Sequence, residues 1–126
     1  MTKRHTDLGA RGEALAASYL EDKGYHVIER NYRFERAEVD LICYDPTAVP
    51  TGDLVFVEVK TRSGLGYGAP EEAVTDSKKK QLVKVSEAYL YQNNMERSSS
   101  RFDVIAIVLR QGDEPEIEHI QHAFWA

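Results

Sequence analysis

The clearest pattern in the chain is an apolar run at residues 54–62, in which valine and phenylalanine predominate. These side chains favour a pleated, buried surface, so the run predicts a β-strand. Side chains alternate across a strand, which places Val55, Val57 and Val59 on one face and Glu58 and Lys60 on the other. Because the run is too apolar for an exposed edge, we expect both charged side chains to be at least half buried. Burying a charge is costly unless the charge pairs or binds an ion.

Apolar periodicity and turn residues divide the rest of the chain into further elements. Thr6 or Asp7 would cap the first helix and Gly24 would end it. A short basic turn joins the first two strands into a hairpin, and the central strand extends it into an antiparallel meander. The next strand follows a helix, so we expect it to lie parallel to the central strand. The predicted elements are helices at 7–23 and from about 75 to 94, and strands at 25–34, 38–44, 54–62, 102–109 and 117–124.

This order of elements predicts an α/β fold with a mixed central sheet flanked by helices, α-β-β-β-α-β with a final edge strand. At 126 residues, we expect one domain spanning 1–126. The composition is ordinary for a soluble globular protein, with 42% hydrophobic and 29% charged residues. No apolar run approaches the length of a membrane span, and residues 1–7 lack the apolar core of a signal peptide. A single cysteine, Cys43, fits a reducing compartment, so we expect a cytoplasmic protein with no membrane partner.

Acidic residues occur within two other apolar patterns. Glu13 lies on the apolar stripe of the first helix with Ala17 and Leu20. It is either part of a site or an acid that the dipole at the helix N-terminus stabilises. Asp40 lies inside a predicted strand, where aspartate is strongly depleted. Glu58 and Lys60 form either a structural ion pair or part of a metal-dependent hydrolytic site. In the second case Asp40 and Glu58, on adjacent strands, would hold a divalent cation such as Mg²⁺, with Glu13 in reach.

The net charge of −5 argues against nucleic-acid binding, but the charge is unevenly distributed. Basic residues concentrate between Lys60 and Lys84, including Lys78, Lys79 and Lys80 in the first turn of the second helix. Such a run is usually a solvated face. Here it closely follows the candidate site, which raises the odds of a contact with phosphate. Lys60 itself would orient a water or offset charge in the transition state.

Other noticeable residues receive plainer interpretations. The glycine-containing stretch 63–70 lacks the spacing of a phosphate-binding loop and predicts a mobile loop, with one helical turn at 71–74. Asp103, at the start of a strand, is interpreted as structural. His119 and His122 have no cysteine partner and are interpreted as surface histidines. Trp125 is expected to cover the edge of the core.

Glu13, Asp40, Glu58 and Lys60, in this order, resemble the site of the PD-(D/E)xK nuclease superfamily, with Glu58-Val59-Lys60 as the (D/E)-x-K motif. Over 8–109 the chain also resembles the small bacterial YraN-type family of predicted endonucleases, similar in fold to archaeal Holliday-junction resolvases. Ala37 departs from the glycine often found before the Glu-x-Asp phrase, and no proline precedes Asp40. The phrases that carry the resemblance are Arg11-Gly12-Glu13-Ala14, Arg30-Asn31-Tyr32-Arg33, Glu38-Val39-Asp40-Leu41-Ile42, Val55-Phe56-Val57-Glu58-Val59-Lys60-Thr61-Arg62 and Arg101-Phe102-Asp103-Val104-Ile105.

The resemblance implies a restriction-endonuclease-like core and a Mg²⁺- or Mn²⁺-dependent endonuclease acting on DNA, with branched or otherwise structured DNA as one candidate substrate. It implies Glu13, Asp40, Glu58 and Lys60 as catalytic residues, the three acids as metal ligands, and compatibility with a homodimer. The alternatives are a catalytically weak nucleic-acid-binding or protein-interaction module on the same fold and, last, a purely structural ion-pair cluster. The residues expected to contact DNA are Arg11, Arg33, Arg62, Lys78, Lys79 and Lys80.

Overall fold

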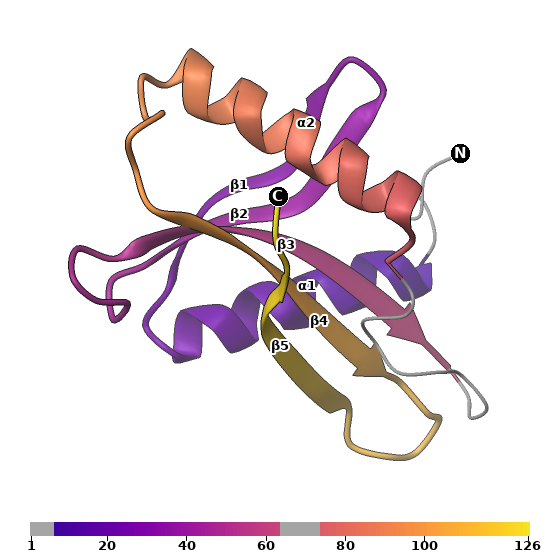
Figure 1. The fold of residues 1–126 in the computed structure, drawn as a ribbon. Helices are drawn as coiled ribbons and strands as arrows, with labels where there is room; N and C mark the ends of the chain where they lie inside the picture. The colour runs from indigo at the N-terminus through magenta and orange to yellow at the C-terminus, as the bar shows by residue number, and fades with distance from the viewer. Residues whose placement is uncertain (1–6, 64–73) are drawn as a thin grey trace.

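The computed structural model describes residues 7–63 and 74–126. Over these residues the chain forms two helices and five strands, in the order predicted from the sequence (Figure 1). The predicted cap Thr6, and all but the ends of the predicted loop and turn at 63–74, lie outside the described residues. The elements are α1 (Asp7–Asp22), β1 (His26–Phe34), β2 (Ala37–Asp45), β3 (Asp53–Arg62), α2 (Asp76–Gln92), β4 (Ser100–Val108) and β5 (Glu116–Phe124).

The described strands form one mixed sheet with the order β1-β2-β3-β4-β5. β1, β2 and β3 are antiparallel neighbours, as the predicted meander requires. β3 and β4 are parallel, because α2 carries the chain back across the sheet between them. β5 pairs antiparallel with β4 and forms the edge. The predicted α/β class, mixed sheet and central position of β3 are therefore confirmed.

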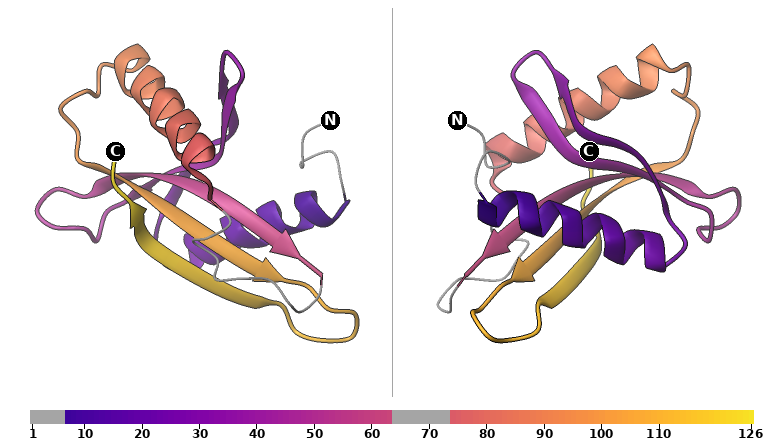
Figure 2. Two further views of the ribbon diagram at one scale, coloured as in Figure 1. Left: turned by 45° about the vertical axis from the view of Figure 1, so that its right-hand side comes forward. Right: turned by 180° about the vertical axis from the view of Figure 1, so that it is seen from behind.

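The two helices cover opposite faces of the sheet (Figure 2). Val55, Val57 and Val59 of β3 pack in the core beneath α1. Leu54 and Phe56 of the same strand pack in the core beneath α2. Fully burying one such side chain contributes about 1.5–3 kcal/mol, so the alternation along β3 fixes which face each helix takes. It also places Glu58 and Lys60 on the face opposite the three valines, as predicted, and this face is the one that α2 covers.

The ends of the helices show why the chain turns where it does. Gly24 follows α1 with φ +92°, a conformation that only glycine adopts readily, and the amide of Tyr25 donates to the carbonyl of Leu20 (3.0 Å). Thr75 caps α2, because its side chain accepts from the amide of Lys78 (3.2 Å). The Gly24 stop and the start of α2 near residue 75 confirm predictions from the sequence.

Two predictions about the C-terminal strand are wrong. Trp125 does not cover the core, because it is 76% exposed. Phe124 takes the buried position instead, stacked on Phe102 at 4.6 Å, and the following residue therefore points outward. His119 is not a surface residue, since its side chain is 3% exposed beneath α1, where its ring contacts Tyr19 edge-on.

The sequence predicts that no segment of the chain spans a membrane, and the lengths and composition of the helices bear on this prediction. Neither α1 nor α2, the helices of the described part of the chain, is long and apolar enough to span a bilayer.

Candidate functional site

Two of the predicted acids are buried, and two lysines approach one of them. Asp40 is 2% exposed and Glu58 is 1% exposed. Nζ of Lys60 lies 3.4 Å from Oε2 of Glu58, and Nζ of Lys78 lies 3.8 Å from the same oxygen. Both lysine side chains remain more than a quarter exposed, so water screens these ion pairs in part. We call Asp40, Glu58, Lys60 and Lys78 the carboxylate–lysine cluster.

The carboxylate–lysine cluster lies where the sheet forks. Pairing between β2 and β3 ends at Leu41 and Val57, and beyond it β2 stays with β1 while β3 stays with β4 (Figure 1). Asp40 is the next residue of β2, and its Oδ2 accepts a hydrogen bond from the amide of Val59 at 2.7 Å. This bond holds the carboxylate of Asp40 beside the peptide that joins Glu58 to Val59. The two buried acids therefore lie where β2 and β3 part.

Glu13 reaches the same end of the sheet from α1. Gly12 packs so closely on β3 that a Cβ there would lie 1.7 Å from Oγ1 of Thr61. The absence of a side chain at Gly12 therefore allows α1 to lie against the end of β3. Glu13 is 8% exposed. It lines a pocket of about 240 Å³ together with Ala10, Ala14, Arg30, Asn31 and Leu41.

The three acids do not form a ready-made ligand set. Within residues 7–63 and 74–126, no three His, Cys, Asp or Glu residues converge closely enough to hold a metal ion. The structure places Asp40 beside the Glu58–Val59 peptide on the fork, whereas Glu13 belongs to the pocket under α1. Mg²⁺ commonly takes one or two carboxylates and fills its remaining positions with water and substrate phosphate. A pair of acids is sufficient for that mode of binding.

The predicted phosphate-binding residues separate into distinct surfaces. Lys78 contacts Glu58, but Nζ of Lys79 lies over the ring of Phe124 (5.7 Å from its centroid) and Lys80 is exposed. Arg11 and Arg33 are exposed, and Arg62 is partly exposed. The N-terminal ends of α1 and α2 both lie at the end of the sheet where β3 finishes (Figures 1 and 2). Their dipoles add positive potential around the acids.

A second buried charged group escaped sequence reasoning. Arg101 is 4% exposed, and its guanidinium contacts three carboxylates, those of Asp45, Asp53 and Asp103, each at 3.0 Å. It also donates to the hydroxyl of Tyr25 at 2.7 Å. Nε2 of His119 lies 2.7 Å from Asp103. We call Tyr25, Asp45, Asp53, Arg101, Asp103 and His119 the Arg101 cluster. The predicted structural role of Asp103 is consistent with this geometry.

Burial and hydrogen bonding shift several pKa values in the Arg101 cluster. Burial raises the pKa of Tyr25 to about 12, although Arg101 opposes the shift. Burial alone would raise the pKa of Asp45, but hydrogen bonds from Thr47 and Arg101 outweigh it and hold the pKa below its usual value. Burial would lower the pKa of Arg101, but its carboxylate partners raise it. At neutral pH Arg101 and Asp45 are therefore charged, and Tyr25 keeps its proton.

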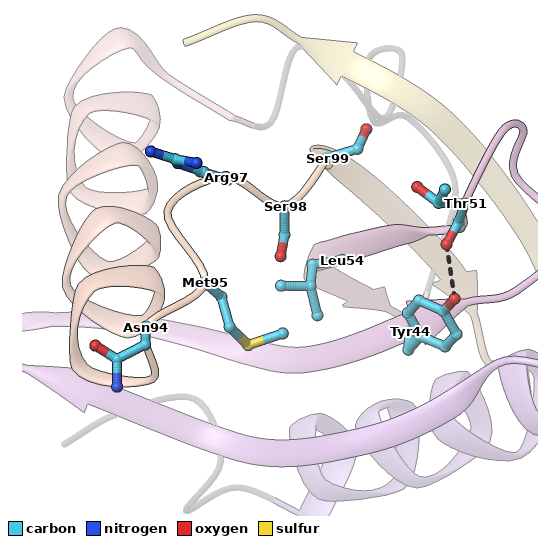
Figure 3. Close-up of a pocket in the computed structure, with 9 residues that line it drawn as sticks. Tyr44, Thr51, Leu54, Asn94, Met95, Arg97, Ser98 and Ser99 are labelled. Carbon is cyan, nitrogen blue, oxygen red and sulfur yellow. Dashed lines mark hydrogen bonds between the residues drawn. The ribbon is translucent and has the colours of Figure 1, made fainter.

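A larger hollow of about 320 Å³ lies elsewhere, at the N-terminal end of β3 (Figure 3). It lies between the β2–β3 connection and the segment that follows α2, where Tyr44 donates to the carbonyl of Thr51 (2.8 Å). Among the described residues that line it, Arg97 is the only charged side chain. The hollow is therefore separate from the buried acids.

Comparison with known sequences places the chain in a family. The profile of the uncharacterised protein family UPF0102 matches residues 12–107. This chain belongs to that family. The match confirms the YraN-type resemblance. A UPF0102 protein of Rhodococcus opacus is 49% identical over 118 residues, covering 93% of this chain and 95% of the relative. One of Trichlorobacter lovleyi is 44% identical over 122 residues, covering 97% and 93%. These names give no activity.

Proposed function

We propose that this UPF0102 protein is a divalent-metal-dependent endonuclease that hydrolyses DNA phosphodiester bonds, built on a restriction-endonuclease-like PD-(D/E)xK core. The observation that carries the proposal is the carboxylate–lysine cluster at the fork of the sheet. Asp40 and Glu58 are almost fully buried there, yet Glu58 faces two partly exposed lysines at 3.4 and 3.8 Å. Burying an acid is costly unless the charge pairs or binds an ion, and the two lysines beside Glu58 remain open to solvent, which supports a role in function.

The donor set fits Mg²⁺ or Mn²⁺. Both ions prefer oxygen ligands, and the carboxylates of Asp40 and Glu58 would provide them, with Glu13 of α1 proposed as a further ligand. Bound there, the cation would polarise the scissile phosphate and lower the pKa of a coordinated water.

The lysines would act on the phosphate itself. Lys60 and Lys78 already lie near Glu58 and keep more than a quarter of their side chains exposed, so both can turn toward an anion. An ammonium group beside the reacting phosphate would offset the charge that accumulates in the transition state. Helix N-termini at the same end of the sheet favour a phosphate for the same reason.

The test is a cleavage assay with single-stranded, duplex, flap and four-way-junction DNA, each with Mg²⁺ or Mn²⁺. Glu58→Gln and Asp40→Asn preserve shape while removing the charge of a ligand, so we expect cleavage to fall by about 100-fold or more. Glu96→Gln is the matched control, because Glu96 is exposed in the segment between α2 and β4. The DNA panel also tests branched DNA as a candidate substrate, and sedimentation of the purified protein tests whether it forms a homodimer. Full cleavage by both site variants would exclude this site.

A second function is favoured by one specific observation. The described residues contain no preformed group of three metal-binding side chains. This observation favours a nucleic-acid-binding or protein-interaction module with weak or no catalysis. Calorimetric titration with Mn²⁺ separates the two proposals. The endonuclease proposal predicts Mn²⁺ binding that is lost in Glu58→Gln. The module proposal predicts no site-specific Mn²⁺ binding, together with DNA binding that Glu58→Gln leaves intact.

A further inference from the structure

An exposed tryptophan stands beside the basic face of α2. Trp125 is 76% exposed, whereas tryptophan side chains are highly buried on average. With Val83 and the lysines at 79, 80 and 84 of α2, it lines a hollow of about 340 Å³. The end of β5 rises beside α2 to make this contact (Figures 1 and 2). The lining of the hollow therefore combines an exposed aromatic ring with three lysine side chains.

The indole ring is held in place by its neighbours. The ring of His122 stacks on it with centroids 4.7 Å apart and an angle of 26° between the planes. The preceding residue, Phe124, is buried and stacked on Phe102, which anchors the backbone. A ring fixed in this way loses little further freedom when a second flat group stacks on it.

The charges around the ring favour an anion. Nζ of Lys79 lies 5.7 Å from the centre of the ring of Phe124, the residue that precedes Trp125. Lys80 is exposed and lines the same hollow. Lys84 is exposed as well and contacts Glu35 at 2.6 Å, while Glu87 is the acid in the lining. Single-stranded nucleic acids are recognised by aromatic rings that stack on bases beside lysines that contact phosphates.

We infer that Trp125 is a base-stacking platform for single-stranded DNA, with Lys79 and Lys80 as contacts for the flanking phosphates. This inference rests on the proposed function and narrows its substrate class to DNA that presents an unpaired base. Lys78, which contacts Glu58, precedes Lys79 on the same turn of α2. Because one turn of helix carries both groups, the hollow at Trp125 and the candidate site lie on neighbouring faces of α2.

The sequence provides a direct probe, because Trp125 is the only tryptophan in the chain. Its fluorescence, excited where tyrosine does not absorb, reports this surface alone. We expect oligo(dT) in the presence of EDTA to quench it strongly, and a blunt duplex of the same length to quench it much less. No quenching by oligo(dT) under conditions where the oligonucleotide is bound would overturn the inference.

Variants measure the contribution of the ring by the anisotropy of a labelled oligo(dT). Trp125→Ala should weaken binding by about 5- to 100-fold, the loss of one stacked base, and Trp125→Phe should restore part of it. The change removes little buried surface, so the fold should be retained. Tyr91→Ala is the matched control, because Tyr91 is 72% exposed on α2 and does not line this hollow. Equal loss in Tyr91→Ala and Trp125→Ala would contradict a specific platform.

The failure of this inference can be told apart from the failure of the proposed nuclease. Glu58→Gln should abolish cleavage and leave the quenching of Trp125 by oligo(dT) unchanged. The quenching is measured in EDTA and therefore does not depend on a bound metal. A protein that cleaves DNA but shows no quenching retains the nuclease and excludes the platform. A protein that is quenched by oligo(dT) but cleaves nothing retains the platform and excludes the nuclease.

Discussion

The sheet carries two buried charged groups that differ in how well their charges are matched. In the Arg101 cluster, one guanidinium meets three carboxylates at 3.0 Å, and its side chain is 3% exposed. In the carboxylate–lysine cluster, Glu58 is as deeply buried, but its lysines stand 3.4 and 3.8 Å away and are partly exposed. Short, bidentate, dry contacts are typical of structure, whereas long contacts that open to water leave room for a ligand.

The largest effect that separates the clusters is expected from Arg101→Ala. This change leaves three carboxylates buried without their shared cation, which costs about 3–5 kcal/mol in the free energy of unfolding. Urea titration of the variant measures the loss. Arg110→Ala is the control, because Arg110 and its partner Glu116 are 31% and 60% exposed, and we expect almost no change there.

Glu58→Gln gives the other half of this comparison. It removes a buried charge whose two lysines stay partly exposed and screened by water, so we expect stability to stay within about 1 kcal/mol of the parent or to rise. A loss as large as that of Arg101→Ala would mean that both clusters are structural, and the contrast between them would disappear.

A smaller effect, on activity alone, is expected from Lys60→Gln. The proposed role of Lys60 is to stabilise charge on the phosphate, so its loss should slow cleavage by about 10- to 100-fold while Mn²⁺ binding is retained. Single-turnover cleavage and calorimetry measure the two quantities separately. Lys23→Gln, at the far end of α1, is the control, and unchanged cleavage in Lys60→Gln would remove this lysine from the chemistry.

Gly12→Ala tests how α1 is positioned at the site. Alanine should gain about 1 kcal/mol from helix propensity, but the new Cβ would meet Thr61 at 1.7 Å and cost about 1–3 kcal/mol. We expect the clash to prevail, with a net loss near 1 kcal/mol and slower cleavage because Glu13 moves. Chemical denaturation and the cleavage assay measure both.

The same substitution in a Thr61→Gly background provides the control. There the obstacle is gone, and Gly12→Ala should become neutral or stabilising. If the loss is the same in both backgrounds, the contact between α1 and β3 is not its cause.

The sequence predicts the carboxylate–lysine cluster more readily than the Arg101 cluster, for a physical reason. Glu58 and Asp40 each interrupt an apolar strand, so the sequence of one strand is enough to show an acid where an apolar residue is expected. The Arg101 cluster has no such local sign, because Asp45, Asp53 and Arg101 each lie near the end of a strand and look like ordinary surface residues. Only the pairing of the strands brings them together.

The elements themselves were predictable because their periodicity is strong. The alternation along β3, the hairpin of β1 and β2 and the glycine after α1 are all local features. The errors at His119 and Trp125 arose at an edge strand, where the side chains of α1 and the position of Phe124 decide what is buried. The lysine run at 78–80 also divides between two surfaces, which spacing alone did not indicate.

The smallest effect is a pH dependence that belongs to the Arg101 cluster. The pKa of Tyr25 is raised to about 12 in the folded chain, against an ordinary value near 10 after unfolding. The folded state therefore holds this proton more tightly, and stability falls as pH rises from about 10 through about 12. Tyr25→Phe should be less stable at neutral pH, because Arg101 loses a hydrogen bond, but its stability should decline less steeply in alkali.

Urea midpoints measured between about pH 8 and about pH 11 check this slope. The raised pKa of Cys43, also about 12, adds a decline that begins near pH 9, so both proteins are compared in a Cys43→Ala background. Tyr91→Phe is the control, since Tyr91 is 72% exposed. Parallel curves for Tyr25→Phe and its parent would show that the tyrosine is not coupled to folding. A reduced slope would confirm that this cluster serves the fold, and would leave the fork of the sheet as the place to seek chemistry.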